Sequence, residues 1–344
     1  MIPVSVLTGF LGSGKTTLLA RLIRDPAMSR TAVIINEFGA VGLDHDLIET
    51  SEESFVQLSN GCLCCNVRSD LTQTLAELAA RRAQGTAPPF ERVVIETSGL
   101  ADPAPILHAL MTERDLIGVY ALDGVITTVD ALLGVTTLDR HEESRRQAAV
   151  ADRIVITKTD LGGTDAVALR RRLTTLNPGA QIVEAVCGAI APAVLFDCGF
   201  YDVAGKHPDV GTWLAHEGGA HEHLRPHSHA HTEGITSFCI VRDAPLRAVT
   251  LPLLLSALAE NCGADLLRMK GIINVLENPQ RPAVMHGVQH VYHAPVWLPR
   301  WPSDDRRTRM VFIGRNLRES WVRSLIELLD AEVAAQSAKQ ASAA

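Results

Sequence analysis

The sequence carries no excess of basic residues and no long apolar run. Its 344 residues have a formal net charge of −7, from 32 Lys and Arg against 39 Asp and Glu. This balance argues against nucleic acid as the main partner. The longest apolar stretches, such as Leu251–Ala259, are far shorter than the roughly 20 residues of a membrane-spanning helix. No basic-then-apolar secretory leader precedes the first predicted strand, so we expect a cytoplasmic protein without a membrane partner.

A disulfide framework is also missing. The seven cysteines are few for a chain of this length, and without a leader they are not expected to pair. Four of them are scattered and are predicted to be small buried hydrophobes: Cys187, Cys198, Cys239 and Cys262. The other three lie together in Cys62-Leu63-Cys64-Cys65 and need a separate explanation.

Length and composition indicate about two domains, each large enough to bury a core. With 47% hydrophobic and 21% charged residues, the chain is typical of a globular protein. In residues 1–200, short β-branched runs alternate with helical stretches, which predicts an α/β domain with a mostly parallel, doubly wound sheet. The predicted strands are 4–7, 32–36, 92–96, 118–129, 152–157 and 181–186, and the predicted helices are 16–24, 70–82, 103–111, 142–150 and 166–176.

The second half has a different pattern. Residues 201–234 are rich in Gly, His and Pro and are predicted to form an exposed linker. Residues 235–335 are predicted to form a smaller α+β domain with an antiparallel sheet, and residues 336–344 a frayed tail. Its predicted strands are 235–242, 266–275, 288–296 and 309–313, with helices at 245–260 and 317–335.

A phosphate-binding loop, Gly9–Thr16, directly follows the apolar run Val4–Leu7 and precedes a helical pattern. Its glycines let successive N–H groups point at a phosphate, and the positive end of the helix adds to the field. Lys15 is expected to reach the β- and γ-phosphates and Thr16 to hold Mg²⁺. The alternative is a glycine turn without a ligand. The predicted phosphate-contacting residues are Gly9, Gly12, Ser13, Gly14, Lys15, Thr16 and Thr17.

The segment Thr157–Asp160 has the Lys-x-Asp spacing of guanine-specific loops and follows a predicted strand. The carboxylate of Asp160 can accept hydrogen bonds from N1–H and the exocyclic amine of guanine, two donors that adenine does not offer together. The stem of Lys158 can lie across the base. An asparagine is more usual where Thr157 stands, so one supporting contact is altered. The alternative is a polar strand end.

Another predicted strand delivers Glu96, and Gly99 follows three residues later. The carboxylate suits Mg²⁺, directly or through water, and the Gly99 N–H can contact the γ-phosphate. We therefore assign the catalytic roles to Lys15, Thr16, Glu96 and Gly99. Asp130 either supports this region or caps a turn. Because no glutamine follows Gly99, slow hydrolysis that depends on a metal or a partner is expected, and the residue that orients water stays unassigned.

The thiol cluster can supply three corners of a tetrahedral metal site through Cys62, Cys64 and Cys65. Soft sulfur ligands suit Zn²⁺ or Cu⁺. The fourth ligand is Glu37, after the second strand, or a water molecule. Two alternatives remain open, a redox-active cysteine pair and inert packing.

Five motifs, taken in order, resemble the CobW family of metal-handling GTPases over most of residues 1–200. They are Gly9–Thr17, Asn36–Gly39, Asn60–Cys65, Glu96–Pro103 and Thr157–Asp160. The linker histidines and Arg268–Gly271 extend the resemblance to the second half. The resemblance implies a GTPase that binds GTP or GDP with Mg²⁺. It also implies that the cysteine motif binds zinc, or cobalt in some members, and delivers it to a client metalloprotein.

Six of the chain's 13 histidines lie within residues 216–231 of the predicted linker, and His227, His229 and His231 alternate along it. Alternation lets three imidazoles project from one side of an extended segment, where they would bind a metal weakly and exchange it rapidly. We predict a metal-collecting arm. A solvated polar linker is the alternative.

These parts suggest a hypothesis in which GTP binding assembles the metal site and hydrolysis loosens it. Allosteric coupling is typically ~1–3 kcal/mol, whereas structural zinc sites bind with roughly 10–16 kcal/mol. An open site of three thiolates, from which a client takes the metal by ligand exchange, is therefore favoured. The second domain is the expected client-recognition surface, and a homo-oligomer is compatible with the sequence. The competing hypotheses are a small-molecule kinase and a non-enzymatic zinc buffer.

Overall fold

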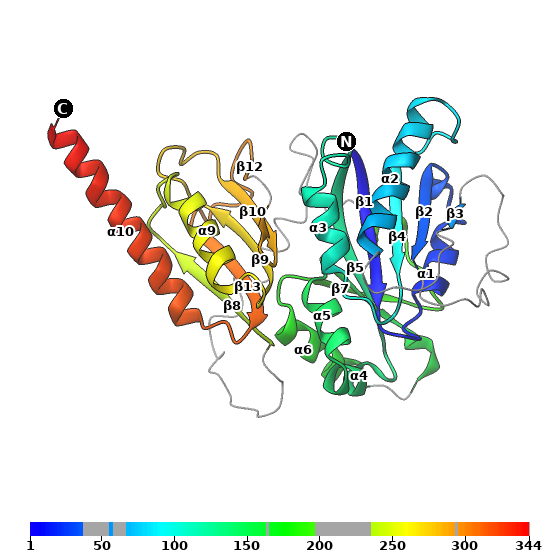
Figure 1. Ribbon diagram of the computed structural model, residues 1–344. Coiled ribbons are helices and arrows are strands. Elements are labelled where there is room, and N and C mark those ends of the chain that lie inside the picture. The colour runs from blue at the N-terminus through cyan, green and yellow to red at the C-terminus, as the bar shows by residue number, and fades with distance from the viewer. Residues whose placement is uncertain (37–54, 58–66, 163–164, 197–234, 293–294, 344) are drawn as a thin grey trace. The chain divides into compact units, whose positions relative to one another are not determined.

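Figure 1 shows the computed structural model, which describes residues 1–36, 55–57, 67–162, 165–196, 235–292 and 295–343. The chain divides into two compact units, Met1–Gly199 and Phe200–Ala344. In the described part of the chain, no helix has the length and apolar character that crossing a bilayer requires.

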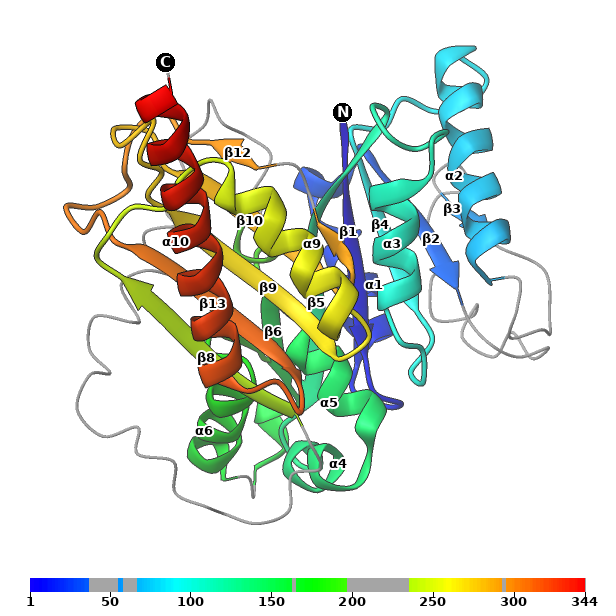
Figure 2. The same cartoon turned by 60° about the vertical axis from the view of Figure 1, so that its left-hand side comes forward.

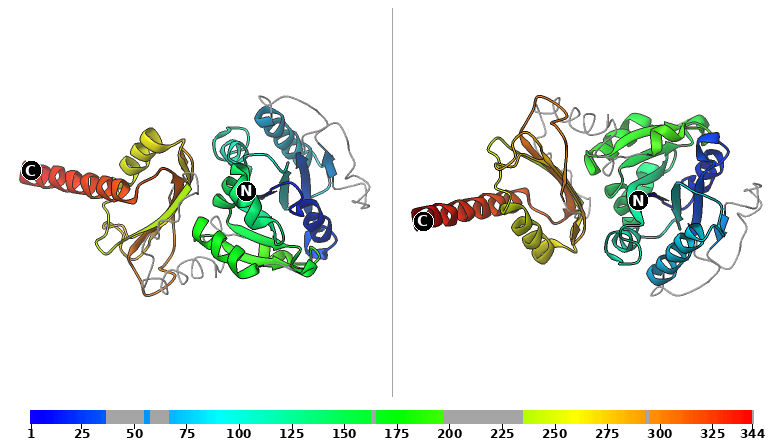
Figure 3. Two further views of the ribbon diagram at one scale, coloured as in Figure 1. Left: turned by 90° about the horizontal axis from the view of Figure 1, so that it is seen from below. Right: turned by 90° about the horizontal axis from the view of Figure 1, so that it is seen from above.

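The first unit is built on a seven-stranded sheet whose order is β3-β2-β4-β1-β5-β6-β7, and every neighbouring pair is parallel. The chain moves outward from β1 in both directions, and helices cover both faces of the sheet (Figure 3). The predicted parallel, doubly wound sheet is thus confirmed. The strands are β1 (Ile2–Gly9), β2 (Thr31–Asn36), β3 (Phe55–Gln57), β4 (Arg92–Thr97), β5 (Tyr120–Asp130), β6 (Arg153–Thr157) and β7 (Gln181–Ala185).

Apolar side chains fix the helices of this unit onto the sheet. On one face, Leu18, Leu19 and Leu22 of α1 pack with Val94 and Val155 of the strands in one buried cluster. The helices are α1 (Lys15–Leu22), α2 (Val67–Ala83), α3 (Ala104–Thr112), α4 (Gly134–Arg140), α5 (Glu142–Ala149), α6 (Ala166–Leu176) and α7 (Pro192–Leu195), and two 3-10 turns are η1 (Pro26–Met28) and η3 (Thr159–Leu161). The sequence did not predict β3, α4 or α7, since runs of three to seven residues are too short to show a period.

The strand register gathers several side chains at one edge of the sheet. Glu96 pairs with Leu7 and Ile35, and Gly9 pairs with Thr128. Because the strands are parallel, their carboxyl ends lie together, on both sides of the central strand β1 where the chain order reverses. Such a switch point is where open α/β sheets bind ligands.

The second unit is an antiparallel sheet of six strands in the order β11-β10-β9-β13-β8, with β12 paired to β10. Helices α9 and α10 lie on the same face of this sheet (Figure 2). The elements are β8 (Ile235–Arg242), α9 (Thr250–Cys262), β9 (Leu266–Ile273), β10 (Ala283–Val288), β11 (Val291–Tyr292), β12 (Val296–Trp297), β13 (Thr308–Arg315) and α10 (Glu319–Ala343). The predicted smaller α+β domain is confirmed.

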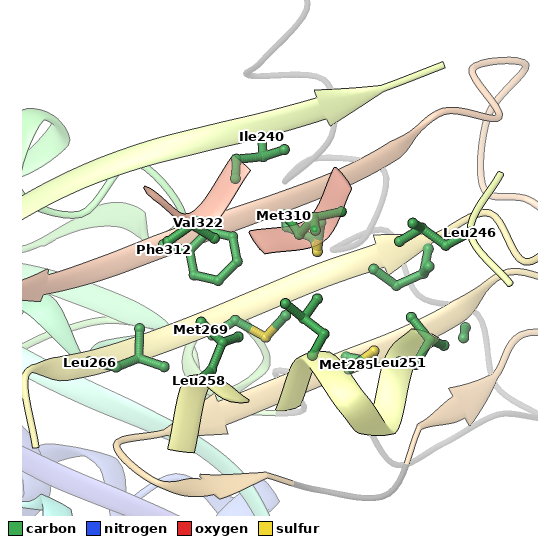
Figure 4. Close-up of a cluster of buried hydrophobic side chains, with 14 of the residues drawn as sticks. Ile240, Leu246, Leu251, Leu258, Leu266, Met269, Met285, Met310, Phe312 and Val322 are labelled. Carbon is green, nitrogen blue, oxygen red and sulfur yellow. The ribbon is translucent and has the colours of Figure 1, made fainter. Parts of the chain in front are cut away.

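Alternation along the strands places one set of side chains between this sheet and its helices. Figure 4 shows Met269 and Phe312 from the sheet facing Leu258 of α9, with Ile240 and Val322 in the same buried cluster. This burial of large apolar side chains is the main contribution to the stability of the unit.

Two expectations for this unit were wrong. The predicted strand 288–296 is a hairpin in which β10 turns at Gln289 and His290 and returns as β11. Gln289 has a φ of 54°, and the turn lacks the Asn-Gly or Gly signal that normally reveals a hairpin. Residues 336–343 continue α10, although we had expected a frayed tail from 336 to 344. Alanine is the strongest helix former, and five of these eight residues are alanine or glutamine, which favours helix over fraying.

Candidate phosphate and base site

The loop after β1 has the shape of a phosphate cradle. Gly9 has a φ of 143°, and a Cβ built on it would lie 2.3 Å from Thr128 Oγ1 and 2.5 Å from Thr128 O. At Gly12, where φ is 70°, a built Cβ would meet no described atom within 4 Å, apart from its chain neighbours. The loop backbone is therefore packed closely against β5 at Gly9, and it borders open space at Gly12. Helix α1 begins at Lys15 immediately afterwards, so its free N–H groups point into the same space.

Lys15 lies back across this loop. Its side chain is only 6% exposed, and Nζ donates to Gly9 O at 3.0 Å and to Phe10 O at 3.4 Å. A buried ammonium group requires such acceptors, because desolvation without them would be costly. The cation is thus held beside the cradle, where the sequence predicted it would meet the phosphates.

Thr16 and Glu96 meet at the start of α1 and the end of β4. The Thr16 hydroxyl donates to Glu96 Oε1 at 2.8 Å, and Glu96 is only 1% exposed. The pair brings a hydroxyl and a carboxylate together next to the cradle, and both are oxygen ligands of the kind that Mg²⁺ takes. The donor set therefore fits the predicted magnesium site, although the carboxyl-terminal edge of the sheet, rather than the sequence spacing, is what joins the two residues.

Ser13 and Thr157 tie the neighbouring loops to the cradle. Ser13 Oγ lies 2.6 Å from Thr128 Oγ1, and the Thr157 hydroxyl donates to Ser13 O at 2.7 Å. Thr157 thus bonds directly to the phosphate loop, at a position where asparagine is more usual. The contact that we expected to be altered is replaced by a short hydroxyl bond.

The loop that the sequence predicts to recognise the base follows β6. Lys158 has a φ of 58°, and its Nζ donates to Asp130 Oδ2 at 2.6 Å. The other oxygen of Asp130 accepts from Leu132 N and Leu133 N, so this residue both caps a turn and holds the lysine. Of the two roles that the sequence left open, Asp130 therefore caps a turn, and its second oxygen holds Lys158 rather than the region of Glu96 and Gly99.

Asp160 is exposed on the turn η3, and its Oδ1 accepts from the backbone N–H of Cys187 at 3.2 Å. This hydrogen bond is the main reason that the pKa of the Asp160 carboxyl lies below its ordinary value. The hydrogen bond thus favours the ionised form of the carboxylate, the form that the predicted recognition of two guanine donors uses.

Cys187 is a residue that the sequence analysis misplaced. It is exposed, with a φ of 50°, and the neighbouring carboxylate of Asp160 raises the pKa of its thiol. It was predicted to be a small buried hydrophobe, as were Cys239 and Cys262, which are only half-buried. Its place just after the carboxyl end of β7 was the signal that could have found it. Cys198 lies outside the described residues.

Gly99 lies against the phosphate loop. A Cβ built on it would be 2.7 Å from Leu11 N and 2.8 Å from Leu11 Cα. The loop after β4 and the loop after β1 are therefore in direct backbone contact. Gly99, the residue predicted to contact the γ-phosphate, therefore lies beside the cradle.

The predicted metal ligands lie outside the described residues. These are Glu37, Cys62, Cys64 and Cys65, together with His227, His229 and His231 of the linker. Within the described part of the chain, no group of three or more His, Cys, Asp or Glu side chains could hold a metal ion. The cysteine site therefore remains a prediction from the sequence.

Together, the parallel sheet, the cradle after β1 and the carboxylate on the loop after β6 define a P-loop nucleotide-binding protein. Residues 3–184 match the model of the CobW/HypB/UreG nucleotide-binding domain, and residues 235–329 match that of the cobalamin synthesis protein cobW C-terminal domain. The chain therefore belongs to the CobW/HypB/UreG family.

Relatives of known name agree with this assignment. The zinc chaperone YjiA of Escherichia coli (strain K12) is 33% identical, over 94% of this chain and 97% of its own. The zinc-regulated GTPase metalloprotein activator 1 of Schizosaccharomyces pombe is 32% identical, over 55% of this chain and 47% of its own. The crystal structure of the Zn(II)-bound YjiA GTPase from E. coli has a TM-score of 0.70 and covers 95% of this chain and 98% of its own, at 27% identity.

Proposed function

We propose that this protein is a GTP-hydrolysing zinc chaperone, which couples GTP binding and slow hydrolysis to the binding of Zn²⁺ and its transfer to a client metalloprotein. The observation that carries the proposal is the meeting of the phosphate cradle, the Thr16–Glu96 pair and the Asp160 loop at one edge of the sheet. Support for the metal cargo comes from the zinc chaperone YjiA, to which almost the whole chain is similar.

In this proposal, Thr16 and Glu96 hold Mg²⁺, whose chemistry is to neutralise charge on the β- and γ-phosphate oxygens. The ammonium of Lys15 and the N–H groups at the start of α1 bind the same oxygens. Gly99 N–H contacts the γ-phosphate. No described residue has been assigned to orient the attacking water, so hydrolysis is expected to be slow until metal or a partner accelerates it.

The guanine preference rests on Asp160 and gives a direct prediction. In Asp160→Asn, an amide N–H₂ would face the guanine amine, whereas xanthine presents a carbonyl there. We expect GTP affinity to fall at least ~100-fold and xanthosine triphosphate to bind more tightly than GTP, as measured by competition binding.

The matched control for this prediction is Asp165→Asn. Asp165 follows Asp160 closely in the chain, but its carboxylate caps α6 by accepting from Ala168 N. Asparagine caps a helix equally well, so this variant should bind nucleotides like the parent. An Asp160→Asn variant that kept the parent's order of affinities for GTP, ATP and xanthosine triphosphate would remove the base assignment.

Zinc is the cargo in this proposal, and Cys62, Cys64, Cys65 and Glu37 are its proposed ligands, with His227, His229 and His231 as weak collecting ligands. An open site of three thiolates suits transfer, because a coupling of ~1–3 kcal/mol could not empty a closed site. The client metalloprotein, a cytoplasmic location and a homo-oligomer remain predictions, as does recognition of the client by the second unit.

Zinc titration of the nucleotide-free, GDP-bound and GTP-analogue-bound protein tests the function. We expect the zinc affinities of the last two forms to differ by about 5–150-fold, the range of ordinary allosteric coupling. The Cys64→Ser, Cys65→Ser double variant should lose most zinc binding and retain GTP binding. Equal zinc affinities in all three forms would contradict nucleotide-coupled transfer, and a preference for ATP would instead favour a small-molecule kinase.

A further inference from the structure

Helix α5 contacts both loops that face the phosphates in the proposed GTP site. The side-chain amide of Gln147 donates to Gly99 O at 3.2 Å and to Ala101 O at 3.0 Å. At the start of the helix, the ring of His141 packs against Phe10 of the phosphate loop, with ring centroids 4.5 Å apart. The sequence motifs singled out none of these α5 contacts.

Gln147 is placed as a fixed strut between the sheet and the loop after β4. It is 0% exposed, so its amide would be costly to bury without hydrogen-bond partners. Both partners are carbonyl groups that only accept, which fixes the direction of the amide. Its own backbone carbonyl accepts from Thr127 Oγ1 at 2.8 Å, which ties this turn of the helix to β5. Gln147 therefore links β5 to the Gly99 loop, through its backbone carbonyl on one side and its side-chain amide on the other.

A second side chain of α5 holds the far end of the same loop. Arg146 Nη1 donates to Asp102 Oδ2 at 3.2 Å, and Nη2 donates to Glu142 at 2.8 Å. The other oxygen of Asp102 accepts from Ala104 N at the start of α3. The loop from Gly99 to Asp102 is therefore anchored to α5 at both ends.

Two buried polar atoms at this junction have no hydrogen-bond partner in the described part of the chain. They are Gln147 Oε1, on the strut, and Ser98 Oγ, on the loop that it holds. Buried polar groups are nearly always paired, and exceptions concentrate where a segment functions as well as folds. Both atoms thus lie either on the Gly99 loop or on the side chain that anchors it.

We propose that Gln147 is a positioning residue for GTP hydrolysis. By holding the carbonyls of Gly99 and Ala101, it sets where the Gly99 N–H meets the γ-phosphate. Gly99 already lies against Leu11, with 2.7 Å between a built Cβ and Leu11 N, so the loop cannot move closer, and without the strut it would move away. The inference rests on the proposed function, since it concerns a phosphate that GTP has and GDP lacks.

The test compares an isosteric apolar replacement, Gln147→Met, with a matched structural control, Asn177→Leu. Asn177 is also a buried amide anchored to α5, since Nδ2 donates to Ala148 O, Ala149 O and Ala151 O, but none of these bonds reaches the Gly99 loop. For each variant, kcat, KM, the affinities for GDP and for a non-hydrolysable GTP analogue, and the melting temperature are measured.

We expect Gln147→Met to lower kcat about 10–100-fold, since a displacement of ~1 Å at a reacting group can cost that much. Its preference for the GTP analogue over GDP should fall at least ~5-fold, with GDP affinity unchanged. Asn177→Leu should lower the melting temperature and keep the parental preference. Should Gln147→Met not fold, Arg146→Ala, which frees Asp102 and Glu142 and leaves the bonds of Gln147 in place, is expected to shift the preference about 2–5-fold in the same direction.

The proposal is overturned if folded Gln147→Met, or failing that Arg146→Ala, keeps both the parental kcat and the parental preference for the GTP analogue. It is also overturned if Asn177→Leu loses that preference equally, because the effect would then be general destabilisation. A parent protein that does not hydrolyse GTP would instead reject the proposed function, so the two failures are distinguishable.

Discussion

Replacing Gly9 with alanine is expected to abolish nucleotide binding and to destabilise the first unit by about 2–6 kcal/mol. This range adds ~1–3 kcal/mol for a side chain in a strained backbone conformation to ~1–3 kcal/mol for overpacking. Both terms apply because φ is 143° and the new Cβ would lie 2.3 Å from Thr128 Oγ1 and 2.8 Å from Ser13 Oγ. The loop and β5 would have to separate, which breaks the cradle. Urea unfolding and GDP binding measure the two effects.

Gly85→Ala is the control for backbone strain alone. Gly85 also has a positive φ, of 70°, but a Cβ there would meet no described atom within 4 Å beyond its chain neighbours. We expect a loss of only about 1 kcal/mol, from the left-handed conformation, and unchanged GDP binding. Equal losses of stability in the two variants would show that contact with Thr128 does not shape the cradle.

The cradle itself could be predicted from the sequence because its function is local. A turn that needs three glycines between a buried strand and a helix leaves few alternatives, and Gly9, Lys15 and Thr16 lie where the spacing placed them. Parallel strands then bring Glu96 to the same edge, since the register pairs it with Leu7. The alternation of strands and helices already predicts a parallel sheet. It therefore also predicts that the strand carrying Glu96 and the strand before the cradle end at the same edge.

The contacts that unite the loops could not be predicted, because each joins residues distant in sequence. Thr157 bonds to Ser13 across 144 positions, and Gln147 bonds to Gly99 across 48. A threonine or a glutamine carries no sign of its partner. Only the assembled sheet shows that Thr157 substitutes a hydroxyl for the more usual amide, and that Gln147 is a strut rather than a surface residue.

Cys187 illustrates a related failure. A cysteine that stands alone in the sequence is most often a small buried side chain, so composition alone predicts burial. The structure instead places it at a left-handed turn after β7, where its N–H bonds to Asp160. The topology of the parallel sheet, which puts the end of β7 beside the end of β6, decides its environment.

The four loops act on one another through these bonds. Lys158 is held by Asp130, Thr157 holds Ser13, and Gly99 lies against Leu11, so the loops after β1, β4, β5 and β6 are in contact with one another. A nucleotide that contacts any one of them therefore biases the rest.

Lys15→Met is expected to lower the rate of GTP hydrolysis about 10²–10³-fold, the usual cost of removing a group that stabilises charge in the transition state. Lys15 is only 6% exposed, and methionine keeps about the length of its side chain but lacks the ammonium that Gly9 O and Phe10 O hold. Affinity for a GTP analogue should fall more than affinity for GDP, because the γ-phosphate loses its cation. Single-turnover hydrolysis and competition binding measure both. Arg24→Met is the control, because it removes one positive charge from an exposed residue just after α1. It should change neither the hydrolysis rate nor the nucleotide affinities by more than about twofold.

The same variant separates a coupled chaperone from a zinc buffer. If Lys15 supplies the contact that distinguishes GTP from GDP, Lys15→Met should bind zinc with nearly the same affinity in its GDP and GTP-analogue forms, although the proposed ligands Cys62, Cys64 and Cys65 are intact. If the variant instead released as much zinc as the parent when GDP replaces GTP, metal handling would not depend on the phosphate cradle. Loss of the difference, with total zinc capacity retained, would establish that the triphosphate is read through Lys15.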